Sequence, residues 1–369
     1  MTPEETRGRI FKITAKHSSK SIRIRPSFGQ FGQEPPGRIV LCQDKFSDKL
    51  EFHFLLFPMD DGTYIISSRK NGNVVDIFAV SNDDRIPSTI FPYHGKDNQR
   101  FTIEDTGDGF CFIRAKHSGK VLDVKGNNKD NLALIHQFHK KSGSDAANQL
   151  FKFEAVGTYQ MPGSSAIEPL PIVPAANSFQ DNLPEETVKV VRGETLLPYF
   201  VIDETLPKDK QVEQTPYYRL QKLQFWTKVF QTVFAGPAQT TKHTVMNGMS
   251  KTHSVEMKKT TKFSIEASGH AAFLEKLSGL KVTIARELSI TETITTTTET
   301  STTVEREVSY VGGQQLLYAE YVLSSQFSLQ RASGIGVKEP WTASNSEEIR
   351  QVGFPVISLQ KIRAKVRTK

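Results

Sequence analysis

The sequence predicts an all-β protein in which a threefold-repeated N-terminal domain precedes an elongated antiparallel β-sheet. Two observations lead to this prediction. Residues 1–155 contain an internal repeat built from short alternating stretches. Farther along, two long stretches rich in Ser and Thr, Lys251–Ser268 and Lys281–Tyr310, alternate apolar and polar residues. Such alternation is typical of half-buried strands on a pleated surface.

Composition limits the classes of function. At 369 residues the chain has the length of two or three domains, and its net charge of +7 is only mildly basic. We find no Cys/His spacing of the zinc type and no phosphate-binding glycine loop. The two cysteines, Cys42 and Cys111, could form one disulfide, but free thiols are favoured. We therefore expect no cofactor, no metal, no catalytic site and no nucleic-acid partner.

The N-terminal repeat has three units. Ala-Lys-His-Ser begins at Ala15 and again at Ala115, and Gln-x-Phe occurs at Gln99 and at Gln149. Gly, Asn and Asp break each unit into short strands. Three such units resemble a β-trefoil of the ricin B-chain lectin type, whose Gln-x-Trp signature is here written Gln-x-Phe. We place this lectin-like, receptor-binding domain at residues 1–155.

The lectin resemblance implies carbohydrate-binding residues in two of the three units. In such sites a carboxylate and an amide bind sugar hydroxyls, and an aromatic ring packs against the C–H face of the sugar. The matching positions are Asp123, His136, Phe138, Asn148 and Gln149 in the third unit, and Asp76, Phe91, Asn98 and Gln99 in the second. The first unit has Arg23 and Leu50 at the Asp and Gln positions, so its site is expected to be lost. The alternative is that Asp and Gln only tie the trefoil turns together.

A change of composition marks the end of this domain. Residues 156–184 are rich in Pro, Gly and Ser and have no periodicity, which indicates an extended connector. Residues 185–369 return to strand patterns, including the aromatic-rich Thr215–Trp226, which reads TPYYRLQKLQFW. Trp226 and Trp341 are expected to pack in the core of this second domain.

Two motifs carry a resemblance to a known family. Thr215–Trp226, together with Phe54–Ile66 (FLLFPMDDGTYII), is similar to the Bacillus binary-toxin-like insecticidal proteins, the relatives of the Bin toxin subunits. The resemblance spans nearly the whole chain. It implies a ricin-type trefoil joined to an elongated, aerolysin-type pore-forming domain, and hence a parasporal crystal toxin. It also leaves open whether a second toxin subunit is required.

Under this resemblance, Lys251–Tyr310 becomes the membrane-inserting hairpin. A spanning strand needs about 9–11 residues, which Thr260–Ser268 and Lys281–Ile290 supply. The hairpin residues expected to face lipid, or to form the tip that crosses first, are Phe263, Ile265, Ala267, Phe273, Leu274, Leu277, Val282, Ile284, Leu288 and Ile290. The polar residues between them, such as Ser264 and Thr283, would face the lumen.

The expected function is that of an insecticidal pore-forming toxin. The trefoil would bind a glycan or glycoprotein receptor on gut cells, and a ring of protomers would each insert one hairpin into the target membrane as a β-barrel. The N-terminus lacks the apolar core of a signal peptide, so we expect a protein made soluble, stored as a crystal or inclusion, and active outside the producing cell. The alternatives are a non-lytic lectin or storage protein and, least favoured, a carbohydrate-active enzyme with a ricin-type module.

Overall fold

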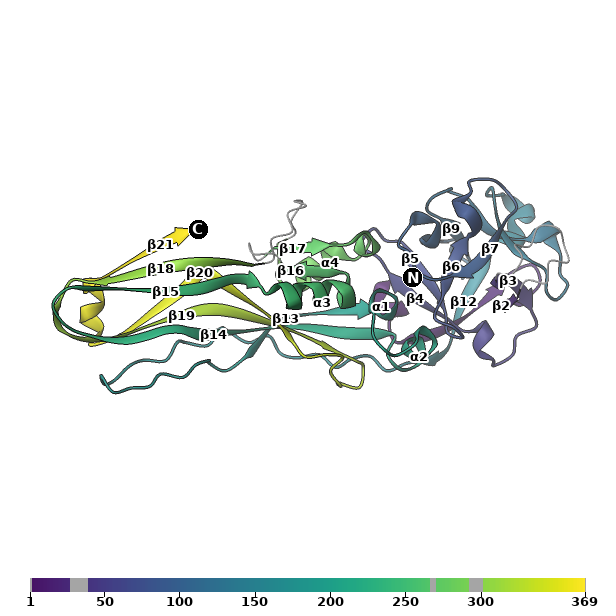
Figure 1. The fold of residues 1–369 in the computed structure, drawn as a ribbon. Helices are drawn as coiled ribbons and strands as arrows, with labels where there is room; N and C mark the ends of the chain where they lie inside the picture. The colour runs from purple at the N-terminus through teal and green to yellow at the C-terminus, as the bar shows by residue number, and fades with distance from the viewer. Residues whose placement is uncertain (1, 27–38, 266–269, 292–300, 369) are drawn as a thin grey trace.

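The computed structural model describes residues 2–26, 39–265, 270–291 and 301–368. It has two β-rich parts arranged end to end, so that the molecule is elongated (Figure 1). The N-terminal barrel lies at one end and the long antiparallel sheet extends away from it. The all-β expectation is therefore confirmed: a trefoil-like barrel is followed by a second antiparallel sheet domain.

The barrel is built from three consecutive groups of four strands, with short connections. They are β1 (Arg9–Ala15), β2 (Ser21–Pro26), β3 (Ile39–Asp44), β4 (Phe54–Pro58), β5 (Tyr64–Ser68), β6 (Val74–Ile77), β7 (Ile86–Phe91), β8 (Phe101–Asp105), β9 (Cys111–Ala115), β10 (Val121–Val124), β11 (Ile135–Phe138) and β12 (Phe151–Thr158). β12 pairs antiparallel with β1, from Ala15–Phe151 to Arg9–Thr158, and so joins the last group to the first. A short helix, α1 (Pro3–Thr6), precedes β1.

The repeated Ala-Lys-His-Ser motif stabilises the contacts between units. Ser18 Oγ donates to Gln43 Oε1 at 2.6 Å, and Ser118 Oγ donates to Gln137 Oε1 at 2.8 Å. The amide of each Gln then donates to backbone carbonyls of a neighbouring loop, as Gln137 does to Ser81 at 2.7 Å. These bonds satisfy polar groups buried between units, which gives the repeated motif a structural role.

The second domain is a long sheet. Its strands are β13 (Val190–Pro198), β14 (Tyr217–Gly236), β15 (Gln239–Met249), β18 (Ser301–Tyr310), β19 (Gly313–Gln330), β20 (Trp341–Phe354) and β21 (Ile362–Thr368). Across the described residues the order is β13-β14-β19-β20-β15-β18-β21. Trp226 and Trp341 are buried, as expected. Before β13, the predicted connector runs along this sheet, where Trp226 Nε1 donates to Pro171 O at 2.8 Å.

The expectation that Lys251–Ser268 and Lys281–Tyr310 are two long strands is wrong for much of their length. Helices occupy α3 (Lys251–Thr261) and α4 (Lys281–Glu287), while β16 (Phe263–Ile265), β17 (Ala271–Phe273) and β18 are extended. Ser250 caps α3 by accepting from His253 N, and Lys262 ends it with a left-handed φ of 69°. One face of α3 is buried, at Ser254, Met257, Thr260 and Thr261. Their spacing of three to four residues is that of a helix, and it decides the structure here in place of the strand-like alternation of apolar and polar residues. Ala267 lies outside the described residues.

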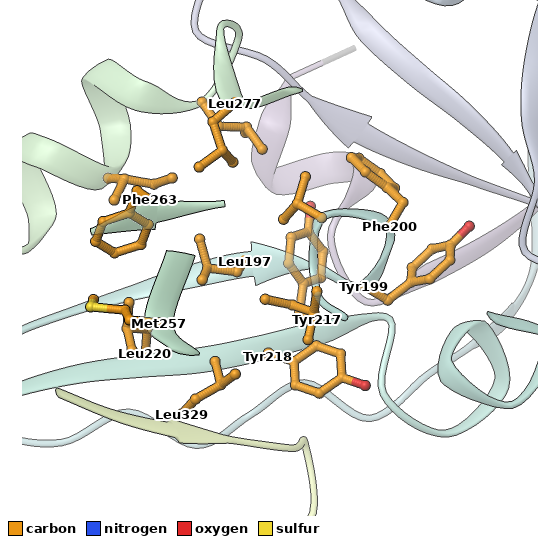
Figure 2. Packing of buried hydrophobic residues seen from close by; sticks show 14 of the residues in the cluster. Leu197, Tyr199, Phe200, Tyr217, Tyr218, Leu220, Met257, Phe263, Leu277 and Leu329 are labelled. Carbon is orange, nitrogen blue, oxygen red and sulfur yellow. The ribbon is translucent and has the colours of Figure 1, made fainter. Parts of the chain in front are cut away.

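The two domains share one continuous apolar core. Phe57 of the trefoil packs in T-shaped geometry on Tyr199 and Phe200, with ring centroids 5.7 and 5.1 Å apart. The buried Tyr199 hydroxyl donates to Gly72 O at 2.6 Å. The same cluster includes Met257 and Phe263, whose side chains gather over Leu197 and Leu220 of the sheet (Figure 2). Residues from α3, β16 and α4 therefore complete the core at the domain junction.

Candidate functional site

The third trefoil unit brings its predicted residues together around a buried carboxylate. Asp123 on β10 is only 1% exposed. His136 Nε2 lies 2.8 Å from its Oδ1, and Gln149 Nε2 donates to its Oδ2 at 2.9 Å. Lys141 Nζ approaches Oδ2 to 3.4 Å. Burial opposes ionisation of this carboxyl, but the hydrogen bonds from His136 and Gln149 outweigh burial and lower the pKa of Asp123.

The aromatic ring and the amide of this unit lie beside that carboxylate. Phe138 stacks on His136 with centroids 5.7 Å apart, and the Lys141 ammonium lies 5.2 Å from the Phe138 centroid. Asn148 Nδ2 donates to Val124 O at 2.8 Å. Next to them is an open depression of about 540 Å³ lined by Asn127, His139, Lys140, Lys141, Ser142, Ser144 and Asp145. Sequence reasoning missed Lys141, because it lies outside the Gln-x-Phe signature.

The second unit repeats this geometry with different neighbours. Asp76 on β6 is buried, and its Oδ2 accepts from Asn98 Nδ2 and Gln99 Nε2, each at 3.0 Å. His94 Nε2 lies 3.1 Å from the same oxygen. Burial raises the pKa of Asp76, against the opposing effect of these partners. Phe91 lies beside His94, with ring centroids 6.1 Å apart.

In both units the predicted Gln donates to the predicted Asp, and a His or Lys side chain also contacts the carboxylate. The predicted Asn donates to the Asp only in the second unit, and in the third it donates to the backbone next to the Asp. The first unit differs: Arg23 pairs with Asp44 at 3.0 Å and with Glu51 at 3.4 Å. An ion pair therefore occupies the position of the acid. Both Asp123 and Asp76 already accept hydrogen bonds from neighbouring side chains. A ligand hydroxyl that binds either carboxylate must therefore share or replace those hydrogen bonds.

The second candidate region is the segment predicted to insert. Most of its predicted lipid-facing residues are stored in the core: Phe263, Ile265, Leu277, Ile284 and Leu288 are buried, and Phe273 and Ile290 pack against the same cluster. Val282 is the main exception, with 56% of its surface exposed on α4, and Leu274 is also exposed. We call residues 270–291, which include β17, the 3₁₀ turn Glu275–Leu277 and α4, the docked segment.

The trefoil holds the docked segment through polar contacts. The Asp60 carboxylate accepts from Val282 N at 2.9 Å and from Thr283 N at 3.1 Å, so it caps α4 from another domain. Tyr93 OH donates to Lys276 O at 3.0 Å. Arg100 donates to Ser278 Oγ at 2.6 Å. We call Asp60, Tyr93, Gly95 and Arg100 the clamp, since the Gly95 backbone also lies against Lys276.

The described residues contain no cluster of His, Cys, Asp and Glu that could hold a metal ion. No helix within the described ranges is long and apolar enough to cross a membrane.

Comparison with known proteins supplies a family context for both regions. A family model described as "Ricin-type beta-trefoil lectin domain-like" matches residues 50–138, and one described as "Insecticidal Crystal Toxin, P42" matches residues 190–353. The binary larvicide subunit BinA of Lysinibacillus sphaericus is 25% identical over 305 residues, which cover 82% of this chain and 80% of BinA. Subunit BinB of the same organism is 26% identical over 367 residues, which cover 93% of this chain and 80% of BinB.

Among solved structures, Cry35Ab1 matches with a TM-score of 0.78 at 20% identity, over 94% of this chain and 90% of that chain. At this identity the match shows the fold, from the trefoil through the long sheet. Together with the sequence relatives, it confirms the resemblance carried by the two motifs.

Proposed function

We propose that this homologue of the Bin toxin subunits and Cry35Ab1 is an insecticidal pore-forming toxin. Its trefoil binds a glycan or glycoprotein receptor on gut cells, and the second domain oligomerises and inserts one hairpin per protomer. Lipid offers no hydrogen-bond partners to an open strand edge, so a spanning sheet must close on itself. One hairpin cannot close, which is why the proposal requires a ring of protomers.

The observation that carries this proposal is the ladder between β15 and β18. The two strands are antiparallel neighbours from Gln239–Tyr310 to Gly248–Ser301 without a register shift. The chain that connects them contains α3 and the docked segment, which alternate in sequence yet are folded compactly. This ladder can therefore lengthen in register, without breaking any of its existing pairs, if the connecting chain becomes extended.

Continuing the same register gives specific pairs. Ile265 then pairs with Ile284, Phe263 pairs with Arg286, and the turn falls at Leu274–Glu275. Paired residues in an antiparallel ladder face the same side of the sheet, so the apolar positions of both strands share one face. Leu288 and Ile290 fall on that face too, while Phe273, Leu274 and Leu277 lie at the tip. Within Thr260–Ser268 and Lys281–Ile290 this face is apolar except at Thr261, which pairs with Leu288, and at Arg286, whose position suits the headgroup level. Lys259, just before the first strand, pairs with Ile290.

The receptor half of the proposal is supported by the two trefoil units that retain an acid, an amide and an aromatic ring. A sugar of the galactose type fits this set, because a carboxylate can accept from two of its hydroxyls and Phe138 offers a face for its C–H groups. The relatives are named as subunits of a binary larvicide, so a second toxin subunit is a candidate partner for this chain.

Dye leakage from liposomes tests the proposal. Protein treated with trypsin is added to vesicles with and without insect-gut membrane extract. We expect leakage that rises with the extract, together with a ring-sized oligomer on the membranes. A non-lytic lectin or storage protein would bind the extract and release no dye. Release that appears only after a Bin-type second subunit is added would assign this chain to a two-component toxin.

A further inference from the structure

The second trefoil unit contributes both to the candidate sugar site and to the clamp on the docked segment. His94 is hydrogen-bonded to Asp76. Its two neighbours in the chain, Tyr93 and Gly95, contact the docked segment. Tyr93 OH donates to Lys276 O at 3.0 Å. Gly95 approaches so closely that a Cβ there would lie 3.0 Å from Lys276 Cα. Gln99 and Arg100 show the same arrangement of neighbours: Gln99 donates to Asp76 in the candidate sugar site, and the adjacent Arg100 donates to Ser278 in the docked segment.

The His94 side chain orders the turn that carries these contacts. Its Nδ1 accepts from Lys96 N at 3.2 Å, so Nε2 carries the proton and donates to Asp76 Oδ2 at 3.1 Å. Its backbone N–H donates to Gln99 Oε1 at 2.9 Å. His94 therefore links the buried acid to both flanks of the turn. If the His94 ring moves, the backbone of the turn at Tyr93, Gly95 or Lys96 must move with it.

We propose that the Asp76–His94 pair controls the grip of the trefoil on the docked segment, so that a ligand which takes Asp76 from His94 loosens residues 276–283. This inference rests on the proposed function, because it names what would regulate insertion of the hairpin. The register continued from β15 and β18 places the hairpin tip at Leu274–Glu275, next to Lys276. The clamp thus holds the part of the segment that would cross the membrane first.

The third unit provides a matched control within the same molecule. Lys141 occupies the position of His94: its backbone N–H donates to Gln149 Oε1 at 2.8 Å, and its side chain approaches Asp123. The pocket beside it is lined by residues of the third unit alone. Removing the Lys141 side chain should alter the third sugar site without reaching the docked segment.

Amide hydrogen exchange of the full chain in solution, without membranes or sugar, tests the coupling. In His94→Ala we expect exchange at the Val282 and Thr283 amides to rise about fivefold, because the docked segment opens more often once its contacts with Tyr93 and Gly95 are loosened. His94→Gln, which keeps a donor for Asp76, should behave like the parent, and so should Lys141→Ala. Trp341 gives a second readout, because its Nε1 lies 3.2 Å from Glu256 on α3 and its emission should shift to the red if α3 also detaches.

Faster exchange in His94→Ala but not in Lys141→Ala supports the coupling. Unchanged exchange in a folded His94→Ala, or exchange that rises equally in Lys141→Ala, would overturn the proposal. Faster exchange in Tyr93→Phe alone would show a clamp that acts without the Asp76–His94 pair. Should His94→Ala fail to fold, Asp76→Asn keeps the side-chain shape and is judged by the same amides. Liposome leakage by the parent is measured separately, so a failure of pore formation is distinguishable from a failure of the coupling.

Discussion

The rings of Phe57 and Tyr217 lie 5.0 Å apart, with their planes inclined by 52°. Phe57 belongs to Phe54–Ile66 and Tyr217 to Thr215–Trp226, the two motifs on which the family resemblance rests. Both rings are buried in the core that joins the domains. The two motifs therefore specify the junction between trefoil and sheet, and Asp60 of the first motif also caps α4.

Phe57→Ala should weaken that junction. Removing a fully buried Phe costs about 3–5 kcal/mol of unfolding free energy, and this ring also contacts Tyr199 and Phe200. In urea we expect the parent to unfold in one transition and the variant in two, because the domains lose their shared core. Phe46→Ala, at a half-buried ring that contacts Phe52 and His53 within the trefoil, should keep a single transition. A single transition with little loss of stability in Phe57→Ala would contradict this role.

Glycan binding through the third unit should depend on Asp123. Asp123→Asn keeps the shape of the side chain but removes the charge and one acceptor for sugar hydroxyls. We expect binding to galactose-type glycans and to gut membranes to fall at least tenfold. Asp108→Asn, an exposed carboxylate of the trefoil paired with Lys16, is the control. If both variants bind like the parent on a glycan array, Asp123 has only the structural role of joining the turns.

The sequence predicted the trefoil well because its repeats are local and periodic. Asp123 and Gln149 were assigned correctly to one cluster, since fixed spacing within a repeat fixes their meeting. The helices were not predicted. The cap of α4 comes from Asp60, which lies 222 residues before Val282 in the chain. The sequence around α4 therefore contains no capping residue from which the helix could be predicted. Lys141 and His94 were missed for a similar reason, as they approach the acids from turns outside the signature.

A buried ion pair ties the proposed pore strand to the sheet behind it. Arg306 on β18 donates to both carboxylate oxygens of Glu320 on β19, at 2.8 and 3.1 Å, and Tyr318 OH donates to it at 2.6 Å. His243 Nε2 lies 3.1 Å away. Burial favours the neutral acid, but these neighbours outweigh it and lower the pKa of Glu320 to about 2.

Because the pKa of Glu320 is lower in the folded state, its contribution to stability is present above about pH 4.5 and is lost as the pH falls toward 2. Glu320→Gln should cost about 3–5 kcal/mol at neutral pH, since Arg306 keeps a buried charge without its partner. It should also flatten the acid dependence of the urea midpoint. Glu305→Gln, at a partly exposed pair with Lys242, should cost under about 1 kcal/mol. Equal midpoints for Glu320→Gln and the parent would contradict the prediction.

Trypsin should remove the basic C-terminal strand. β21 is an edge strand that pairs with β18, from Tyr310–Ile362 to Val304–Thr368, and Arg363 and Lys365 are exposed on it. Cleavage there would uncover the backbone donors and acceptors of β18, which can then pair with another protomer. Mass spectrometry should show loss of the terminus together with a gain in oligomer and undiminished potency. An intact terminus in fully toxic, digested protein would count against activation at this end.

The measurement that tests the central claim most directly compares Val282→Lys with Thr283→Lys in liposome leakage. Val282 is exposed on α4 and its neighbour Thr283 is half-buried, and both donate their amides to Asp60. In the inserted hairpin Val282 faces lipid and Thr283 faces the lumen, so a lysine at Val282 should cost about 2–4 kcal/mol per protomer near the bilayer midplane. We predict that Val282→Lys folds, binds membranes and releases no dye, while Thr283→Lys releases dye with altered conductance. Parent-like leakage from folded Val282→Lys would place the inserted element elsewhere in the chain.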